Sequence, residues 1–139
     1  MPGLPQSPEP SDPLVLPAFG TVEPGRVLTF DDLFAVIHDK FPVSPGHTLI
    51  IARRAVSRFQ DLTAAEKDRL LFWIAWAQTH LSAALVPPPD AFNFGLNDGP
   101  AAGQTILQFH FHVIPRYGGD VPDPRGGVRW IVPEKARYW

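Results

Sequence analysis

Apolar residues recur at helical spacing in the segment that follows Thr63. These residues are Leu70, Trp73, Ile74, Ala77, Leu81 and Ala84. Their spacing places them along one stripe of an amphipathic helix. Residues 63–66 read Thr-Ala-Ala-Glu, which is the S/T-x-x-E spacing of a capping box, so we expect the helix to begin there. Proline cannot continue a helix, so Pro87 is expected to end it.

Three segments have patterns typical of β-strands. Residues 47–52 are short and β-branched, and they follow a Pro-Gly turn signal. Residues 92–97 alternate apolar and polar side chains, and residues 105–116 form the longest candidate. Residues 33–40 fit a short helix or a strand, and we favour a strand. Strands around one dominant helix predict an α+β domain whose antiparallel sheet is covered on one face.

The length of 139 residues and the uneven distribution of proline indicate one domain with an extra arm. Domains commonly contain roughly 100–150 residues. A content of 45% hydrophobic and 19% charged residues is typical of globular proteins. We interpret the proline-rich residues 1–13 as a disordered or extended arm, because proline interrupts sheets and helices. Residues 14–139 then form a single domain that ends in a Gly- and Pro-rich tail.

The composition also excludes several classes of function. A formal net charge of −2 argues against nucleic-acid or anionic-membrane binding through bulk charge. The chain has no cysteine, which excludes disulfides, thiolate metal sites and thiol nucleophiles. No apolar run approaches the roughly 20 residues that span a bilayer, and the N-terminus does not have the pattern of a secretory signal. We therefore expect a cytoplasmic protein.

The candidate chemistry lies in residues 105–116. Side chains alternate between the two faces of a strand, and the odd-numbered residues 107–113 are all apolar. The even-numbered set contains Gln108, His110 and His112, so this reading puts three polar side chains in a row on the other face. Same-face neighbours are separated by roughly 6.5–7 Å, a gap that a phosphoryl group can span.

A loop of small residues leads into this segment. Residues 97–105 read Asn-Asp-Gly-Pro-Ala-Ala-Gly-Gln-Thr. Such a loop lets backbone N–H groups approach an anion closely. Gln104 and Thr105 add side-chain donors. A glycine-containing loop is a weak signal by itself, but its place directly before two same-face histidines makes an anion site more specific.

Residues 103–116, Gly-Gln-Thr-Ile-Leu-Gln-Phe-His-Phe-His-Val-Ile-Pro-Arg, resemble the signature of the histidine triad superfamily of nucleotide hydrolases and transferases. That signature is His-φ-His-φ-His-φ-φ, where φ is apolar, and Gly-Gln-Ser/Thr commonly precedes it. Residues 41–47, with Pro-Gly-His at their end, are similar to a second family motif. The resemblance covers residues 27–116. The tail at 123–130 resembles bacterial members related to the fragile-histidine-triad branch.

The resemblance implies a role for each matching residue. His110 would be the nucleophile, His112 would contact the phosphate and the departing group, and His47 would orient His110 through a hydrogen-bond network. The implied substrate-binding residues are Asp39, Asn97, Gly103, Gln104, Thr105 and Gln108. Gln108 is the one departure, because it stands where the family has the first His of the triad. Glutamine can hydrogen-bond, but it cannot become a cation.

The family also implies a fold and a reaction. The fold would be a five-stranded antiparallel sheet with one long and one short helix. Attack at an α-phosphate would give a covalent nucleotidyl-histidine that water hydrolyses. The implied substrates are dinucleoside polyphosphates, such as diadenosine tri- or tetraphosphate, or nucleoside phosphoramidates. No tightly bound cofactor is expected, and Mg²⁺ would serve only as a counter-ion of the substrate.

A homodimer is the expected assembly of a family member of this size. Large aromatic residues often bury interfaces. The candidates here are Trp73, Trp76, Trp130 and Trp139.

Two other functions remain open. The first is a purine-nucleotide-binding protein with little catalysis, and the replacement of a triad histidine by Gln108 motivates it. The second is a metal site, because His110 and His112 have the H-x-H spacing of some zinc ligands. A third ligand would then have to come from His47 or from an acidic residue. The sequence offers no obvious carboxylate on the same face, which counts against the metal site.

Overall fold

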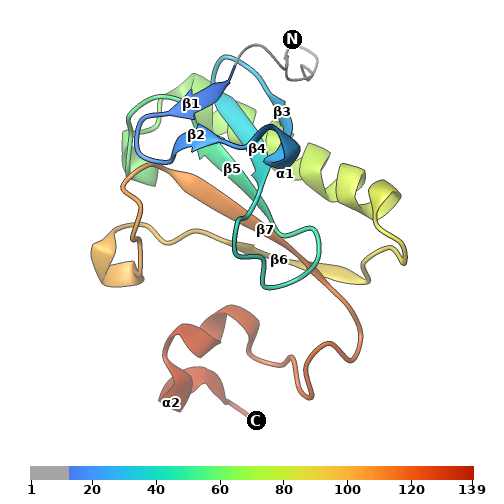
Figure 1. The fold of residues 1–139 in the computed structure, drawn as a ribbon. Helices are drawn as coiled ribbons and strands as arrows, with labels where there is room; N and C mark the ends of the chain where they lie inside the picture. Colours follow the sequence, from blue (N-terminus) through green and yellow to red (C-terminus); the bar gives the residue numbers. More distant parts are fainter. Residues whose placement is uncertain (1–12) are drawn as a thin grey trace.

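The computed structural model describes residues 13–139 (Figure 1). The predicted arm at 1–13 lies outside the described residues except for Pro13. The strands are β1 (Leu14–Leu16), β2 (Gly20–Val22), β3 (Val27–Phe30), β4 (Phe34–His38), β5 (Thr48–Ala52), β6 (Ala91–Gly95) and β7 (His110–Arg116). The helices are α1 (Ala64–Ala84) and α2 (Pro133–Ala136), with short 3₁₀ turns at Pro24–Arg26, Phe59–Asp61, Pro100–Ala102 and Gly127–Ile131.

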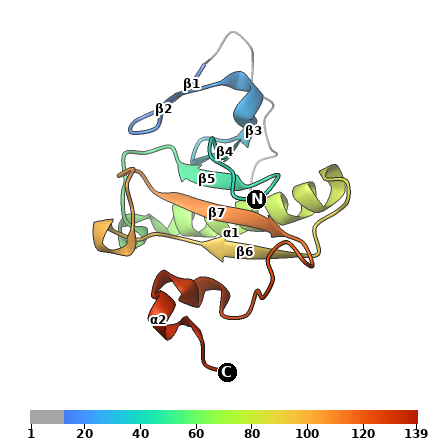
Figure 2. The ribbon, with the colours of Figure 1, turned by 60° about the horizontal axis from the view of Figure 1, so that its bottom comes forward.

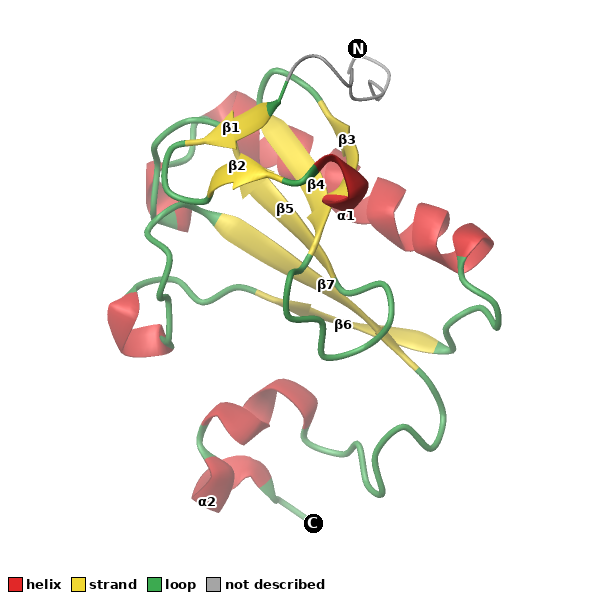
Figure 3. Cartoon of the chain, in the orientation of Figure 1, coloured by secondary structure: helices red, strands yellow, loops and turns green. Residues whose placement is uncertain are grey.

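The main sheet has five strands in the order β3-β4-β5-β7-β6, and every neighbouring pair is antiparallel. A separate hairpin of β1 and β2 completes the β-structure of the described residues. Helix α1 connects β5 to the edge strand β6 and lies across one face of the sheet (Figure 3). The predicted α+β class and five-stranded antiparallel sheet are therefore confirmed.

Helix α1 begins at the predicted capping box. The Thr63 side chain accepts a hydrogen bond from the Glu66 N–H, and the Glu66 carboxylate accepts one from the Thr63 N–H. The same carboxylate forms an ion pair with Arg54, which fixes the start of the helix against the chain that follows β5. The helix ends at Ala84, shortly before Pro87.

The larger core lies between α1 and the sheet. Its buried members include Phe34, Val36, Ile50, Phe109 and Val113 from the sheet side, and Leu70, Trp73, Ala77 and Leu81 from α1. Trp73 is fully buried, and its indole N–H donates to Asp31 Oδ2 at 2.9 Å. A buried core residue cannot contact a second subunit, so the candidate role of Trp73 at a dimer interface is wrong.

The β1–β2 hairpin covers part of the opposite face of the sheet (Figure 2). Leu14, Leu16 and Val22 pack on buried side chains of β4 and β5 in a second apolar cluster. Neither hairpin strand nor α1 covers the rest of this face, along β7 and β6, although the hairpin turn reaches β7 at His110. We call this region the open face, and it carries the candidate chemistry.

The strand that carries the histidines is shorter than the alternating pattern predicts. The prediction was 105–116, but β7 begins at His110. Leu107 is 58% exposed and Gln108 is fully buried, which is the reverse of the burial expected for these two residues. The Phe109 N–H donates to the Val56 carbonyl, so the chain leaves the regular ladder at this point. The alternation holds only from Phe109 onward.

The C-terminal segment lies beyond β6 (Figures 1 and 2), and its 3₁₀ turn Gly127–Ile131 contacts that strand. Cation–π contacts pair Arg125 with Trp139 and Arg129 with Tyr138 within the segment. Several of its apolar side chains are exposed, and Ile131 is 83% exposed. Within residues 13–139, no helix has the length and apolar character that crossing a bilayer requires.

Candidate active site

Two histidines of β7 point to the open face. His110 lies opposite Ile51, and His112 lies opposite Leu49 on one side and Gly95 on the other. The two imidazole centroids are 5.3 Å apart. Gly95 places no side chain across from His112, so the strand pairing leaves that side of the ring uncovered. The predicted same-face arrangement of these two histidines is what the structure shows.

His47 lies just before β5 and contacts His112 directly. The Val43 N–H donates to His47 Nδ1 at 3.2 Å, and His47 Nε2 lies 2.9 Å from His112 Nδ1. Because Nδ1 of His47 accepts, the ring proton of neutral His47 must be on Nε2, which donates to His112. His112 Nδ1 is then an acceptor, so its own proton is on Nε2. The direct partner of His47 is thus His112, whereas the sequence suggested His110.

His110 has the opposite tautomer. Its Nδ1 lies 2.8 Å from the carbonyl oxygen of Gln108. A carbonyl can only accept a hydrogen bond, so Nδ1 of His110 carries the proton. Nε2 of His110 is left with a free lone pair. The two neighbouring rings therefore offer different groups at Nε2: a lone pair on His110 and an N–H donor on His112.

Burial keeps this pair of supporting imidazoles neutral. Burial, followed by the charges of His110 and His47, lowers the pKa of His112 to about 4, while Asp39 opposes the shift. Burial also lowers the pKa of His47, against the effect of Asp39. Both rings are therefore uncharged at neutral pH, as the hydrogen-bond directions require.

Asp39 completes the cluster from the end of β4. Its Oδ2 lies 3.3 Å from His47 Nε2, and its Oδ1 accepts the Phe41 N–H. One ligand atom each of Asp39, His47 and His112 lie within 4.8 Å of one another. The fold thus supplies a same-face carboxylate that the sequence did not reveal, and these three residues could hold a metal ion.

The small-residue loop forms a tight turn between β6 and β7. Its centre is the 3₁₀ turn Pro100–Ala102, and Gly103 follows in the left-handed conformation with φ of 98°. A Cβ atom added at Gly103 would lie 4.0 Å from Cγ of Asn97. The turn therefore brings Asn97 beside Gly103. Asn97 and Thr105 are both exposed.

Gln104 is used differently from the expectation. Its side chain is buried, its Oε1 accepts the Gly99 N–H, and its Nε2 donates to the carbonyls of Ser57 and Ile106. Both amide hydrogens are thus engaged inside the loop. The side chain holds the loop in shape, and a direct contact between this amide and a phosphate would require these bonds to break.

Gln108 is fully buried, and its amide points toward the turn of the β1–β2 hairpin. Its Oε1 accepts the N–H groups of Ala18 and Phe19 at 2.9 and 3.3 Å, and its Nε2 donates to the Ala52 carbonyl at 2.7 Å. A contact between this amide and a substrate would therefore require these bonds to break. The Gln108 amide bonds only to the protein backbone, and these partners lie too far away in the sequence to be seen there.

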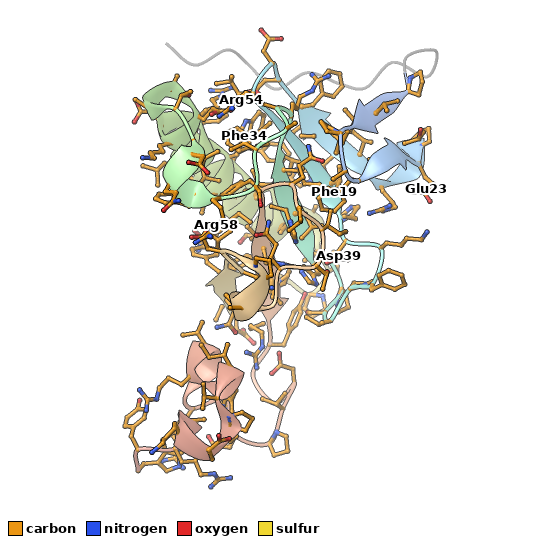
Figure 4. The ribbon with its side chains drawn as sticks, turned by 90° about the vertical axis from the view of Figure 1, so that its left-hand side faces the viewer. Phe19, Glu23, Phe34, Asp39, Arg54 and Arg58 are labelled. Carbon is orange, nitrogen blue, oxygen red and sulfur yellow. The ribbon has the colours of Figure 1, made fainter. Side chains whose placement is uncertain are left out.

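Phe19 is a site residue that sequence reasoning missed. Its ring lies 5.1 Å from that of His110 in an edge-to-face arrangement. Phe19 and Asp39 lie on the hairpin side of the sheet, opposite α1 (Figure 4). A phenylalanine in a hairpin turn carries no chemical signal, so only the fold could reveal this contact.

A cavity of about 610 Å³ lies along β7 beyond His112, with Ile114 and Arg116 in its wall. It is bounded by the loop before His47, by β6 and β7, and by the C-terminal segment; Val43, Gly95, Ile114, Tyr117 and Trp130 are among its walls. Gly95 pairs with His112, and Ile114 follows His112 on the same face. The walls are mainly apolar and aromatic, which suits a planar ring better than a phosphate group.

Comparison with known proteins agrees with the family resemblance of the sequence. A sequence profile described as the HIT domain matches residues 21–119. The chain is 34% identical over 105 residues to the bifunctional bis(5'-adenosyl)-triphosphatase/adenylylsulfatase FHIT of Arabidopsis thaliana, covering 74% of this chain and 57% of that protein. It is 36% identical over 100 residues to the AP-4-A phosphorylase of Mycobacterium tuberculosis, covering 70% of this chain and 50% of that protein.

The fold is similar to that of the Caenorhabditis elegans NitFhit protein, with a TM-score of 0.69 and 28% identity over 86% of this chain and 27% of that one. The chain thus spans little more than half the length of the two curated relatives. The profile match covers most of the chain, and the histidine cluster lies within it. This chain belongs to the HIT domain family.

Proposed function

We propose that this protein hydrolyses dinucleoside polyphosphates at an α-phosphate, with Nε2 of His110 as the nucleophile. The observation that carries the proposal is the pair of opposite tautomers on β7. A lone pair and an N–H donor stand side by side at Nε2 of His110 and of His112. A displacement at phosphorus needs these two functions, one for the attacking atom and one for the departing oxygen.

The reaction then has two steps. In the first, His110 Nε2 forms a bond to the α-phosphorus, and the bond from that phosphorus to the bridging oxygen breaks. The bridging oxygen leaves with its electron pair and accepts a hydrogen bond from the His112 Nε2–H. In the second, water attacks the nucleotidyl-histidine, the P–N bond breaks, and the lone pair returns to His110. One proton of the water is lost as its oxygen bonds to phosphorus, and the second ionises from the phosphate of the released AMP, so both pass to solvent.

The state of His112 favours a phosphate leaving group over an amine. With a pKa of about 4, His112 is a neutral hydrogen-bond donor at pH 7 and not an acid that can give up a full proton. A nucleoside polyphosphate is stable as an anion and needs only that hydrogen bond. An amine must take up a proton to depart. The names of the two curated relatives point to the same class of substrate.

The surroundings of the histidines suit the two halves of such a substrate. Asn97, Gly103 and Thr105 lie on the loop that leads into β7, where we expect phosphate oxygens. We expect Asp39 to contact the ribose of the transferred nucleotide. The cavity beyond His112 would accept the departing nucleoside, because its aromatic walls can stack on a base. Mg²⁺ would act as a counter-ion of the polyphosphate.

The test is AMP release from diadenosine tri- and tetraphosphate with Mg²⁺, for the wild type and for His110→Ala. We expect release by the wild type and its loss in His110→Ala, with His80→Ala as the control because His80 stacks on Trp76 outside the cluster. A nucleotidyl adduct in the intact mass of rapidly quenched wild type would support the covalent step. Equal rates in the wild type and His110→Ala would refute it.

A nucleotide-binding protein without turnover is the alternative to this proposal. The sequence suggested this alternative because Gln108 replaces a triad histidine. In the structure that side chain is buried and bonds to the backbone only. Tight AMP binding by both the wild type and His110→Ala, with no AMP release by either, would favour the alternative.

A metal site has its own supporting observation, the approach of Asp39, His47 and His112 within 4.8 Å. Two imidazoles and a carboxylate are a common ligand set for zinc. Metal analysis of the purified protein tests it: stoichiometric zinc that is lost in Asp39→Ala and retained in His110→Ala would favour it. Metal-free protein with full AMP release would exclude a resident ion from the reaction.

A further inference from the structure

Gln108 joins three distant parts of the chain at one buried point. Its amide oxygen accepts from Ala18 and Phe19 in the hairpin turn, and its amide nitrogen donates to Ala52 at the end of β5. Its backbone carbonyl accepts from His110 Nδ1. A single residue therefore contacts both the hairpin and the proposed nucleophile.

The turn that Gln108 holds carries Phe19, whose ring lies edge-to-face with that of His110 at 5.1 Å. An edge-to-face contact is directional, because the edge of one ring meets the face of the other. It therefore restricts rotation of the imidazole about its own side-chain bonds. His110 is held at Nδ1 by the Gln108 carbonyl and on its ring by Phe19.

The strands of the hairpin are fixed independently of this contact. Leu14, Leu16 and Val22 pack on the sheet, and Phe19 itself packs against this apolar cluster. Only the turn between β1 and β2 needs a further tie, and the Gln108 amide supplies it. The tie is specific, because one oxygen accepts two adjacent backbone N–H groups while the nitrogen donates to a different strand.

We propose that Gln108 and Phe19 are positioning residues for His110: the Gln108 amide ties the hairpin turn to β5, and the Phe19 ring so placed holds the imidazole with Nε2 toward the substrate. Gln108 in the place of the first triad histidine is then a working part of this chain and not a lost catalytic group. The inference rests on the proposed function only for its kinetic readout. Its structural readout is independent of turnover.

The first test is on Phe19→Leu, which keeps apolar bulk in the cluster but removes the aromatic edge. The matched control is Phe30→Leu, because Phe30 is a partly buried aromatic residue of the same cluster that contacts Arg53 and not His110. We expect Phe19→Leu to lower kcat on the order of tenfold to a hundredfold with KM within about twofold, as for a misplaced reacting group. Phe30→Leu should leave kcat near the wild-type value.

The second readout is the ¹⁵N spectrum of the His110 imidazole, which distinguishes the two neutral tautomers. We expect one tautomer, protonated at Nδ1, in the wild type and in Phe30→Leu. Phe19→Leu and Gln108→Met should give averaged signals from a mobile ring. A role that is only structural would lower the melting temperature in all three variants and leave the His110 signals unchanged.

Gln108→Glu provides a reversible version of the same test. A protonated carboxyl group accepts through its C=O and donates through its O–H, so it reproduces all three amide bonds. The ionised group would face the Ala52 carbonyl oxygen without a proton between them. Burial favours the neutral form. We therefore expect the rate of Gln108→Glu, taken as a ratio to the wild type at each pH, to approach one at low pH and to fall as pH rises.

The outcomes separate the two proposals. A fixed His110 tautomer in Phe19→Leu and Gln108→Met, together with unchanged kcat, would overturn the positioning role. A pH-independent ratio for Gln108→Glu would contradict the part assigned to the amide. If the wild type releases no AMP, the proposed function fails, and the ¹⁵N spectra still decide whether Gln108 and Phe19 hold the ring. If Gln108→Met does not fold, Phe19→Leu and Gln108→Glu carry the test.

Discussion

Two histidines on one strand have different chemistry here because each meets a different partner at Nδ1. His110 faces a carbonyl that can only accept, and His112 faces the protonated nitrogen of His47. The Val43 backbone N–H sets the direction of the hydrogen bonds between His47 and His112. It can only donate, so Nδ1 of His47 must accept and the ring proton of His47 is on Nε2. Backbone groups thus determine which imidazole nitrogen can attack and which can donate.

Removing His47 should disturb His112 without touching the nucleophile. In His47→Ala, Nδ1 of His112 loses its donor, and the ring is free to carry its proton on either nitrogen. We expect kcat to fall by about tenfold or more, since a wrong tautomer is costly in such networks. Kinetics with diadenosine triphosphate measure this, with His80→Ala as control. An unchanged kcat would show that His112 does not depend on His47.

The buried histidines also predict a pH dependence of stability. The pKa of His112 in the folded protein is about 4, below the value of about 6.5 for an unfolded histidine. At a pH between these two pKa values, His112 is protonated in the unfolded chain and neutral in the folded protein. The free energy of unfolding should therefore fall as the pH drops from about 6.5 toward 4, and His112 should add no slope above that range.

Urea unfolding at several pH values between 5 and 7 measures this slope. The lowered pKa of His47 adds to it in the same direction. His112→Asn should unfold with a shallower pH dependence than the wild type. A slope that is identical in the wild type and His112→Asn would contradict the burial effect.

At the scale of elements, the sequence predicted the helix and strands that depend on residues close together in the chain. The capping box and the apolar stripe located α1, the β-branched run after a turn signal located β5, and alternation located the later part of β7. The pattern failed at Leu107 and Gln108, because the partners of Gln108 lie 90 and 56 residues away in the sequence. Long-range backbone bonds overrode alternation there, and they leave no trace in the sequence.

The same reason explains which site residues were found. His110 and His112 share a strand face and a motif, so the sequence could predict that they lie close together. Phe19 and the direct His47–His112 contact depend on how separate segments meet. Gln104 had the expected residue type, but its amide is used inside its own loop.

The capping box gives an element-scale prediction. Thr63→Ala removes the side chain that accepts the Glu66 N–H. We expect the free energy of unfolding to fall by about 1 kcal/mol, with little change in kcat because α1 covers the face opposite the histidines. Chemical unfolding checks the first part and AMP release the second. Thr63→Ser keeps the acceptor, so it should stay close to the wild type.

At the scale of the whole molecule, the C-terminal segment, which lies beyond the edge strand β6, exposes apolar side chains. Ile131 is 83% exposed, and Trp130 and Trp139 are 40% and 41% exposed. Contiguous exposed apolar surface is typical of interaction sites. This surface supports the expected homodimer, with Trp76, Trp130 and Trp139 as the remaining aromatic candidates.

Light scattering at micromolar concentration tests the assembly. We expect the mass of two chains for the wild type and a shift toward one chain for Ile131→Lys, because a buried lysine is costly at an apolar interface. A single-chain mass for the wild type would refute the dimer. An unchanged dimer in Ile131→Lys would place the interface elsewhere.

The hairpin is the one part of the described β-structure that shares no strand pairing with the main sheet. It is attached by apolar packing and by the amide of Gln108. Segments with few such ties open at lower free energy than the core to which they are attached. The backbone amides of the hairpin should therefore exchange with deuterium well before those of β5. Each such opening would uncover His110 while the rest of the protein stayed folded.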